Sequence, residues 1–494
     1  AQSIVNEFLR TAERLTNLGL SYLSLDRAGS TLSNGELQRV QISRAVRSDT
    51  TGVLYVLDEP SIGLHPYNVD GLMKIVRELV DRKNSVVLVD HDPRILMDAD
   101  QLIEIGPGAG KEGGRIVTQG TPLEAEKNPH SLIGPYLSGK ESLKVRSRAT
   151  EKDMFENGSI RIKTKPFYTV KALDVSIPKG RMIAVTGVSG SGKTSLVIEC
   201  LVPALQAVIQ GTKLPEHVDS IEAKGIQSVK VIDSKPIGAN VRSTVATYDG
   251  VFDDLRKLFA RTADAKAKGL TAGDFSYNTG KLRCPVCDGT GIITMDVQFL
   301  PDVDTICPSC GGSRYGKDAY DILWKSKEKD SVSVSLPGLL KLTVEEAAGI
   351  LHEETKIAKQ LKILQDLGVC YLTLGEATPA LSGGEAQRLK LAYEMETPQQ
   401  GSVFVFDEPT IGLHPQDVKK LVLIFDHLIQ LGATVIVIEH DLELVTNCDY
   451  IIDMGPWGGT EGGRVVVEGT PEAVAATSES ITGRYLKQEL AEDK

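Results

Sequence analysis

Short apolar runs that end in acidic residues or histidine recur along the chain. VLYVLDEP (53–60) and VFVFDEP (403–409) end in carboxylates, and VVLVDHD (86–92) and VIVIEHD (435–441) end around a histidine. MIAVTG (182–187) is a similar run. Continuous apolar runs of this length are typical of strands that are buried on both faces of a parallel sheet. We therefore expect buried strands with polar, catalytic ends.

Helical periodicity separates these runs. GLMKIVRELVDR (71–82) and TSLVIECLVPAL (194–205) read as helices, and AQSIVNEFLRTAERL (1–15) reads as an amphipathic helix and not as a signal peptide. Strands that alternate with helices predict nucleotide-binding α/β domains. The sequence has no run of about 18 apolar residues. We therefore expect no membrane partner and a cytoplasmic location.

The early and late parts of the chain repeat each other at a fixed offset. The match includes GPGAGKEGGRIVTQGTP (106–122) and GPWGGTEGGRVVVEGTP (455–471). A constant offset over about a hundred residues indicates duplicated domains. Three pairs of polar residues are each 349 positions apart (382 − 33 = 349), namely Ser33 and Ser382, Asp58 and Asp407, and His91 and His440.

One phosphate-binding loop, GVSGSGKT (187–194), lies between a predicted strand and a predicted helix. Its glycines let backbone N–H groups wrap the phosphates of ATP, Lys193 is expected to reach the β- and γ-phosphates, and Thr194 to ligate Mg²⁺. The first repeat would need its own loop upstream of residue 1, so the chain is either a naturally short protein or a fragment. The predicted nucleotide-binding residues of the loop are Gly187, Ser189, Gly190, Ser191, Gly192, Lys193 and Thr194.

The residues at the strand ends are the predicted catalytic groups. Asp407 is placed to bind Mg²⁺, Glu408 to polarise the attacking water, and His440 to hydrogen-bond the γ-phosphate. A lone histidine is more often structural, but its position after a strand and its repetition favour a functional role. Glu59 and His91 are the equivalent catalytic residues of the first repeat.

Two signature sequences complete the set, LSNGE (32–36) and LSGGE (381–385). A serine hydroxyl and glycine N–H groups at a helix start suit the capping of a γ-phosphate. These parts identify an ABC-type ATPase, whose domains pair head to tail. The single loop therefore needs the early signature, while the second site lacks its loop within these residues. The predicted signature contacts are Ser33, Gly35, Ser382, Gly383 and Gly384.

Four of the seven cysteines form two close pairs, in CPVCDGTG (284–291) and CPSCGGSRY (307–315). The spacing C-x2-C-x19-C-x2-C suits four thiolates around a structural Zn²⁺ ion. The alternatives are two disulfides or a redox pair, which fit poorly with a cytosolic chain. The predicted metal ligands are Cys284, Cys287, Cys307 and Cys310.

The predicted architecture is α/β, with one complete and one partial ABC-type P-loop ATPase domain, helical signature regions and an inserted zinc module. The chain is long enough for two or more domains. The expected boundaries are 1–50 for the first signature region, 51–140 for the C-terminal part of the first ATPase domain, 141–165 for a linker, 166–212 and 400–494 for the second ATPase domain, and 213–399 for the second signature region with the zinc module at 280–316.

The chain resembles the C-terminal half of the UvrA family, the damage-recognising component of the bacterial excinuclease. The resemblance covers nearly the whole chain and implies a dimeric, DNA-damage-scanning ATPase in nucleotide excision repair, with the zinc module near damaged duplex DNA. The family's binding domain for the partner helicase of the excinuclease lies upstream of the first signature and is absent here. The resemblance rests on LDEPSIGLHP (57–66), FDEPTIGLHP (406–415), VRSTVATYDGVFDDLR (241–256), MDVQFLPDV (295–303) and ITGRYL (481–486).

Three positions depart from the family pattern. Asn34 replaces a signature glycine, Ser234 stands where the family has a glutamine that faces Mg²⁺ and water, and Asp90 replaces a glutamate. These changes suggest a divergent branch, such as the UvrA-like proteins of antibiotic self-resistance, or relaxed coupling of ATPase activity. The chain would act as a homodimer or pair with a separate N-terminal half.

The net charge of −11 argues against a generally DNA-coating surface but leaves room for a local basic groove. The zinc cysteines are flanked by basic and aromatic residues that would meet phosphates, and a solvated mixed face is an equal alternative. These residues are Lys281, Arg283, Arg314, Tyr315 and Lys317.

Three other functions compete with a UvrA-type ATPase. The ATPase component of a membrane transporter would not be expected to carry the zinc insertion. A translation-associated soluble ABC protein would need two complete phosphate loops and no zinc module. A non-catalytic remnant that is kept for partner binding is compatible with the single loop.

Overall fold

The computed structural model describes residues 2–32, 34–46, 50–108, 113–141, 144–238, 240–295, 303–327, 332–395 and 397–492. These residues form two compact units. Unit 1 comprises residues 1–233 and 398–494, and unit 2 comprises residues 234–397. Unit 2 is therefore an insertion into the second repeat.

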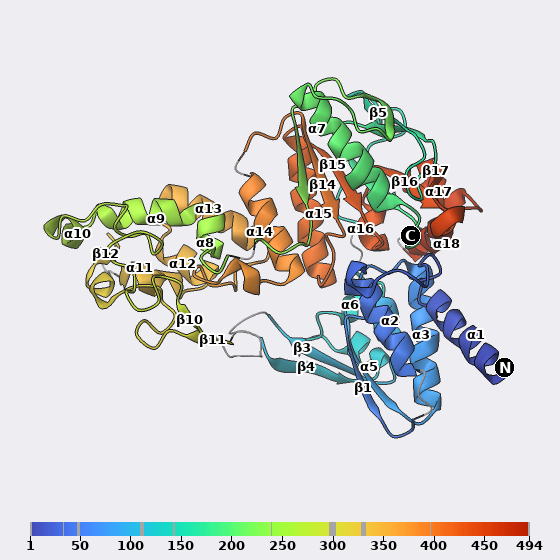
Figure 1. Cartoon of the computed structure of the whole chain (residues 1–494), viewed down its shortest axis with the longest axis horizontal. Coiled ribbons are helices and arrows are strands. Elements are labelled where there is room, and N and C mark those ends of the chain that lie inside the picture. Colours follow the sequence, from blue (N-terminus) through green and yellow to red (C-terminus); the bar gives the residue numbers. More distant parts are fainter. Residues whose placement is uncertain are drawn as a thin grey trace. The chain divides into compact units, whose positions relative to one another are not determined.

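Unit 1 is built around a six-stranded sheet that contains the predicted strands of the second repeat (Figure 1). β7 lies inside this sheet and pairs in parallel with β15 and β16. All residues of β7 and β15 are buried, which confirms the prediction from their apolar runs. The order across the sheet is β17 (Arg464–Gly469), β16 (Tyr450–Gly455), β7 (Met182–Thr186), β15 (Thr434–Ile438), β14 (Ser402–Asp407) and β9 (Ser228–Ile232).

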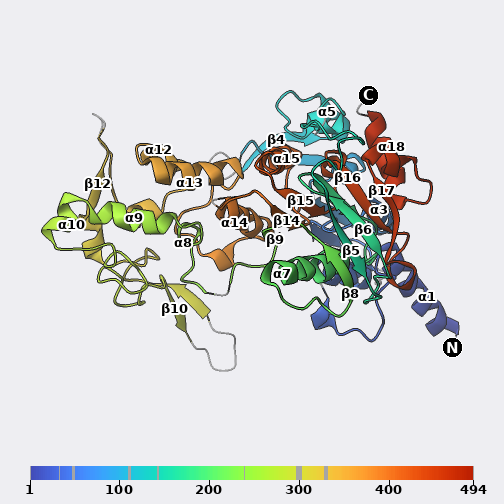
Figure 2. The same ribbon diagram turned by 90° about the horizontal axis from the view of Figure 1, so that it is seen from above.

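A three-stranded antiparallel sheet shares the core of this domain (Figure 2). The core also takes in the predicted helix after the phosphate loop, which begins as a π-helical segment, η3 (Ser195–Leu201), and continues as α7 (Val202–Gln210). The loop is thus anchored on both sides by buried apolar residues. The strand order is β6 (Asp174–Pro178), β5 (Ser159–Thr164) and β8 (Val218–Glu222).

Two predicted boundaries differ from the structure. The last part of the expected linker, 141–165, forms β5, because Ile160 and Ile162 alternate into the core. The linker also packs earlier, since Arg146 pairs with buried Asp449 at 3.1 Å. Strands β8 and β9 lie in unit 1, so the second signature region begins at 234 and not at 213.

The first repeat forms two separate strand pairs. Parallel β1 (Leu54–Asp58) and β2 (Ser85–Val89) form one, and antiparallel β3 (Leu102–Gly106) and β4 (Arg115–Gly120) form the other. Within the described part of the chain, no strand joins β2 to β3 as β7 joins β15 to β16.

The prediction that β1 and β2 are buried on both faces is therefore wrong. Alternate residues of both strands are exposed, because within the described residues nothing covers their second face. The exposed apolar side chains include Leu54, Val56, Val87, Val89, Ile103 and Ile105.

Helices complete unit 1. α1 contacts α2 and α3, which Figure 1 draws in blue, and within the described residues α3 supplies five of the eleven buried residues of the core cluster of the first repeat. The helices are α1 (Gln2–Asn17), α2 (Asn34–Val46), α3 (Pro66–Asp81), α4 (Pro93–Met97), α5 (Pro122–Lys127), α6 (Gly134–Leu137), α15 (Pro415–Gln430), α16 (Leu442–Thr446), α17 (Pro471–Ala476) and α18 (Ile481–Glu492).

Unit 2 is mainly helical and carries two small hairpins. One hairpin, β10 (Ile292–Met295) with β11 (Val303–Ile306), lies between the two cysteine pairs, and the other joins β12 (Leu323–Lys325) to β13 (Ser333–Ser335). No helix in the described ranges has the length and hydropathy to cross a membrane. The helices are α8 (Val245–Tyr248), α9 (Val251–Ala260), α10 (Ala263–Ala267), α11 (Leu336–Leu340), α12 (Val344–Ile350), α13 (Thr355–Asp366) and α14 (Gly383–Met395).

Candidate active site and metal centre

The phosphate loop leaves β7 at Thr186 and makes a tight turn before η3. Gly187 has φ 130°, and a Cβ atom there would lie 2.0 Å from the carbonyl oxygen of Met454. Gly192 has φ 99°, a conformation that L side chains rarely adopt. Only glycine therefore fits these two positions, as the motif predicts.

Lys193 lies over the loop. Its Nζ donates to the carbonyl oxygens of Gly187 and Val188 at 2.9 and 3.0 Å. Burial lowers the pKa of Lys193 to about 8, although the nearby carboxylates of Glu408 and Asp453 oppose this. Thr194 is exposed at the start of η3, and the buried Ser191 hydroxyl has no hydrogen-bond partner in the described residues. These groups can turn toward an incoming phosphate.

Glu408 follows β14 directly and has φ 48°, which turns it out of the strand. Its Oε1 lies 3.8 Å from Nε2 of His440. Burial, followed by the negative charge of Asp407, raises the pKa of Glu408 to about 7. Burial, with Lys193 and His65 nearby, lowers the pKa of His440 well below its usual value. A carboxylate beside a neutral imidazole can accept a proton from water near neutral pH.

Glu439 is a site residue that the sequence analysis missed. It is buried, accepts from the backbone N–H of Thr410 at 3.1 Å and of His440 at 2.6 Å, and accepts a short hydrogen bond from the Thr410 hydroxyl. Asp90 makes the equivalent bonds to Ser61 and His91 in the first repeat. The acid before each histidine therefore holds the histidine backbone in place. Asp90 and Glu439 are 349 positions apart, so the repeat offset is the sequence signal that could have identified them.

The first repeat reaches the phosphate-loop site. A Cβ atom on Gly63 would lie 2.8 Å from Oε2 of Glu408, and one on Gly190 would lie 2.5 Å from the ring of Tyr22. Arg39 of α2 is buried, and its charge lowers the pKa of Glu408. The two repeats thus build one site within unit 1.

The early signature is only partly described. Ser33 lies outside the described residues, so its predicted role is not placed. A Cβ atom on Gly35 would lie 3.4 Å from the carbonyl oxygen of Ile62, so the signature packs on the segment that follows β1.

Glu59 and His91 form the equivalent pair in the first repeat. Nδ1 of His91 lies 3.9 Å from Oε1 of Glu59, and burial raises the pKa of Glu59. A Cβ atom on Gly412 would lie 3.5 Å from Oε1 of Glu59, which mirrors the approach of Gly63 to Glu408.

The late signature lies in unit 2, at the start of α14. Ser382 and Glu385 cap this helix reciprocally, with Ser382 N–H donating to Oε2 at 2.7 Å. A Cβ atom on Gly383 would lie 3.2 Å from the carbonyl oxygen of Ser234. The structure therefore brings Ser234 beside Gly383, and Gly384 is buried in the same helix.

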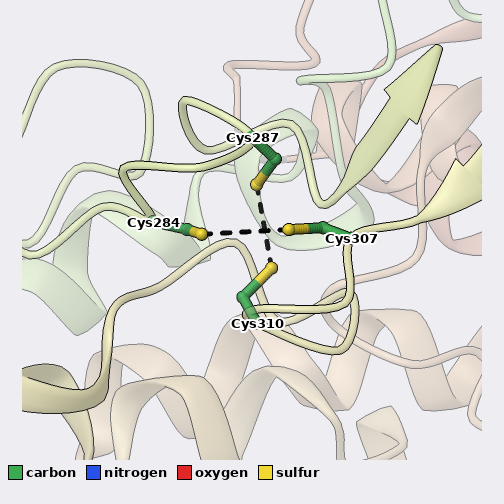
Figure 3. Close-up of side chains that lie close together, drawn as sticks. All are labelled: Cys284, Cys287, Cys307 and Cys310. Carbon is green, nitrogen blue, oxygen red and sulfur yellow. Dashed lines mark hydrogen bonds between the residues drawn. The ribbon is translucent and has the colours of Figure 1, made fainter. Parts of the chain in front are cut away.

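The four predicted metal ligands point toward one centre (Figure 3). Their sulfur atoms all lie within 4.8 Å of one another, with Cys284 to Cys307 at 4.0 Å and Cys287 to Cys310 at 3.7 Å. Zn–S bonds of about 2.3 Å in a tetrahedron require sulfur atoms about 3.8 Å apart. A disulfide needs about 2.05 Å, so this arrangement fits a metal ion and not two disulfides.

Backbone turns shape this cluster. Asp288 and Gly289 have φ 49° and 77°, and Gly311 and Gly312 have φ 56° and 83°. The N–H of Gly291 donates to the Cys287 sulfur at 3.3 Å, which stabilises a thiolate. Residues 296–302 of the predicted zinc module lie outside the described residues.

Of the two interpretations left open for the residues around the cysteines, phosphate contact is contradicted for Arg314 and Tyr315 by their burial. Arg314 is buried over the ring of Tyr277, 5.2 Å from its centroid, and Tyr315 is buried and donates to the Phe275 carbonyl oxygen at 2.6 Å. Exposed Lys281 pairs with Asp274, and half-buried Arg283 pairs with Asp288, which is typical of a solvated mixed face.

Comparisons with known proteins identify similar sequences and structures. UvrABC system protein A of Staphylococcus aureus (strain COL) is 44% identical over the whole chain. The chain is homologous to UvrABC system protein A. It covers 51% of that relative, so it spans about half the length of the curated relatives it matches. No protein-family model matches the chain.

Solved structures give the same result. The chain matches UvrA2 from Deinococcus radiodurans with a TM-score of 0.89 and 39% identity, over 99% of this chain and 58% of that one. The archaeal ribosome recycling factor aABCE1, in its complex with stalk protein aP1, matches with a TM-score of 0.52 at 17% identity, over 97% of this chain and 76% of that one. This last likeness shows the fold alone, an α/β fold shared with ABC-type ATPases.

Proposed function

We propose that this chain is an ATP-hydrolysing, DNA-binding protein of the UvrA type that acts in DNA-damage recognition for nucleotide excision repair. The observation that carries the proposal is the site that the two repeats share. Gly63 and Arg39 of the first repeat approach Glu408 of the second, beside Lys193 of the phosphate loop. The identity of 44% to UvrABC system protein A over the whole chain supports the link to repair.

The loop N–H groups, Lys193, Glu408 and His440 each have a role in the proposed hydrolysis of ATP. Loop N–H groups and Lys193 bind the phosphates of ATP, and closure of the first repeat excludes bulk water. Glu408 orients and deprotonates the attacking water, for which its pKa of about 7 suits it near neutral pH. His440 remains neutral and donates a hydrogen bond to the γ-phosphate.

Two metals fit the donor groups. Thr194 and Asp407 supply oxygen atoms that suit Mg²⁺, whose role would be to neutralise phosphate charge. The four clustered sulfur atoms suit a structural Zn²⁺. Ser234, which lies beside Gly383 in unit 2, is proposed to take the place of the glutamine that faces Mg²⁺ and water in the family.

The proposed partner is damaged duplex DNA. The net charge of −11 requires that DNA contacts be local. The chain would act in the cytoplasm as a homodimer, in a system that includes the partner helicase of the excinuclease.

A DNA-binding titration with a non-hydrolysable ATP analogue tests the proposal. We expect binding to lesion-containing duplex that changes at least about threefold with the analogue, because nucleotide closure and DNA binding are linked. Lys193→Ala should bind DNA but not respond to the analogue. Absence of duplex binding at physiological salt, with and without analogue, would contradict the proposed function.

A further inference from the structure

A buried chain of hydrogen bonds connects the first repeat to the strand that feeds the phosphate loop. Nε2 of His65 lies 3.1 Å from the Thr482 hydroxyl oxygen, and this hydroxyl lies 2.6 Å from Oδ1 of Asp453. Asp453 also accepts from the hydroxyl of Thr186 at 2.8 Å, the residue before Gly187. The side chains that make up this series of hydrogen bonds are each at most 2% exposed, namely those of His65, Thr482, Asp453 and Thr186.

The direction of these bonds follows from the chemistry. Nδ1 of His65 accepts from the backbone N–H of Tyr67 at 3.2 Å, so in the neutral imidazole the proton is on Nε2. Nε2–H then donates to the Thr482 oxygen, which leaves the Thr482 hydroxyl to donate to Asp453. Each donor has one acceptor, and the ring of His65 is held in a single orientation.

His65 in turn contacts His440. Their rings meet edge to face, with centroids 5.8 Å apart at 88°. Nδ1 of His440 is buried without a hydrogen-bond partner in the described residues, and Nε2 lies 3.8 Å from Glu408, beyond hydrogen-bond distance. Packing against His65 therefore orients the His440 ring, since the ring nitrogen atoms make no hydrogen bond to the described residues that would do so.

Within the described residues, the positions related by the offset of 349 do not form an equivalent series of hydrogen bonds. His414, Ile133 and Glu104 correspond to His65, Thr482 and Asp453, and Thr186 has no counterpart in the 494 residues. His414 corresponds to His65, accepts from Gln416 N–H at 3.2 Å and meets Tyr136 edge to face, as His65 meets Tyr485. Ile133 occupies the position of Thr482, and Nε2 of His414 is buried without a partner within the described residues. In the described part of the protein, this series of hydrogen bonds is thus complete only at the site that has the phosphate loop.

We infer that His65 and Thr482 are positioning residues of the ATPase site. They hold the His440 ring in the orientation that hydrolysis requires, and they connect the first repeat to the phosphate loop. The inference deepens the proposed ATPase function and rests on it for the effect on turnover. It gives the ITGRYL segment, which begins α18, a role in the active site through Thr482.

Replacement of Thr482 by Val removes the hydroxyl and keeps the shape. We expect Thr482→Val to lower kcat about tenfold while the KM for ATP changes less than about twofold, because the phosphate cradle is untouched. Thr482→Ser should restore kcat. Ile133→Val, the matched change in the first repeat, should leave both values as in the parent.

Imidazole NMR on ¹⁵N-histidine-labelled chain without nucleotide separates this inference from the proposed function. Thr482→Val should shift the ring signals of both His65 and His440, and Ile133→Val should shift neither. If the parent shows no turnover but the signals shift, the proposed function fails and the positioning network stands. If Thr482→Val leaves the His440 signals and any turnover unchanged, the inference is wrong.

Discussion

Replacement of Glu408 by Gln is expected to abolish ATP turnover and to leave nucleotide binding intact. Glutamine keeps the shape of the side chain but cannot accept a proton from water, and loss of a general base costs roughly 100-fold to 10,000-fold in rate. The loop N–H groups and Lys193 remain, so affinity for ATP should change less than about threefold. Steady-state hydrolysis and equilibrium nucleotide binding measure the two effects.

The pH dependence offers a second measure of the same residue. Because burial raises the pKa of Glu408 to about 7, the carboxylate takes up a proton as pH falls through this value. We expect kcat/KM to decrease below about pH 7, since the protonated acid cannot act as a base.

Glu59→Gln is the matched change in the first repeat. Glu59 faces Gly412 and pairs with His91, but no phosphate loop of its own repeat lies within the 494 residues. Its effect on turnover should stay below about fivefold. Parent-like turnover in Glu408→Gln would show that another group acts as the base.

Removal of zinc is expected to unfold the cysteine module while unit 1 retains its fold. A structural zinc site contributes on the order of 10 kcal/mol to the folding of its module. We expect one Zn²⁺ per chain by elemental analysis, and its extraction should speed amide exchange at Gly291 and Cys307, whose N–H groups bond within the module. Amides of β7 and β15 should remain protected.

Two cysteine variants provide the control. Cys287→Ser removes one ligand and should lower zinc content well below one per chain. Cys370→Ser changes a cysteine outside the cluster and should leave zinc content unchanged. Metal-replete protein without zinc would contradict the assignment of the site.

The sequence predicted those parts of the site that are local. The loop at 187–194, Glu408 and His440 lie in short motifs next to apolar strands, and the constant offset identified Glu59 and His91 as a second copy. Four cysteines at close spacing predicted the metal centre, because two short turns bring each pair together.

Long-range contacts could not be predicted in this way. His65 and Thr482 are 417 positions apart, and neither residue type signals a hydrogen bond to the other. Charge patterning was misleading for Arg314, because its guanidinium stacks on Tyr277 inside unit 2 and not on a phosphate. Burial of β1 and β2 was overestimated, because an apolar run cannot report whether a neighbouring strand covers it.

Calorimetric titration of a non-hydrolysable ATP analogue measures whether the two repeats of this chain share one complete nucleotide site. We expect one nucleotide bound per chain, and no binding in Lys193→Ala, because Lys193 belongs to the one phosphate loop of the sequence. Two nucleotides per chain, or one that Lys193→Ala still binds, would contradict a single shared site.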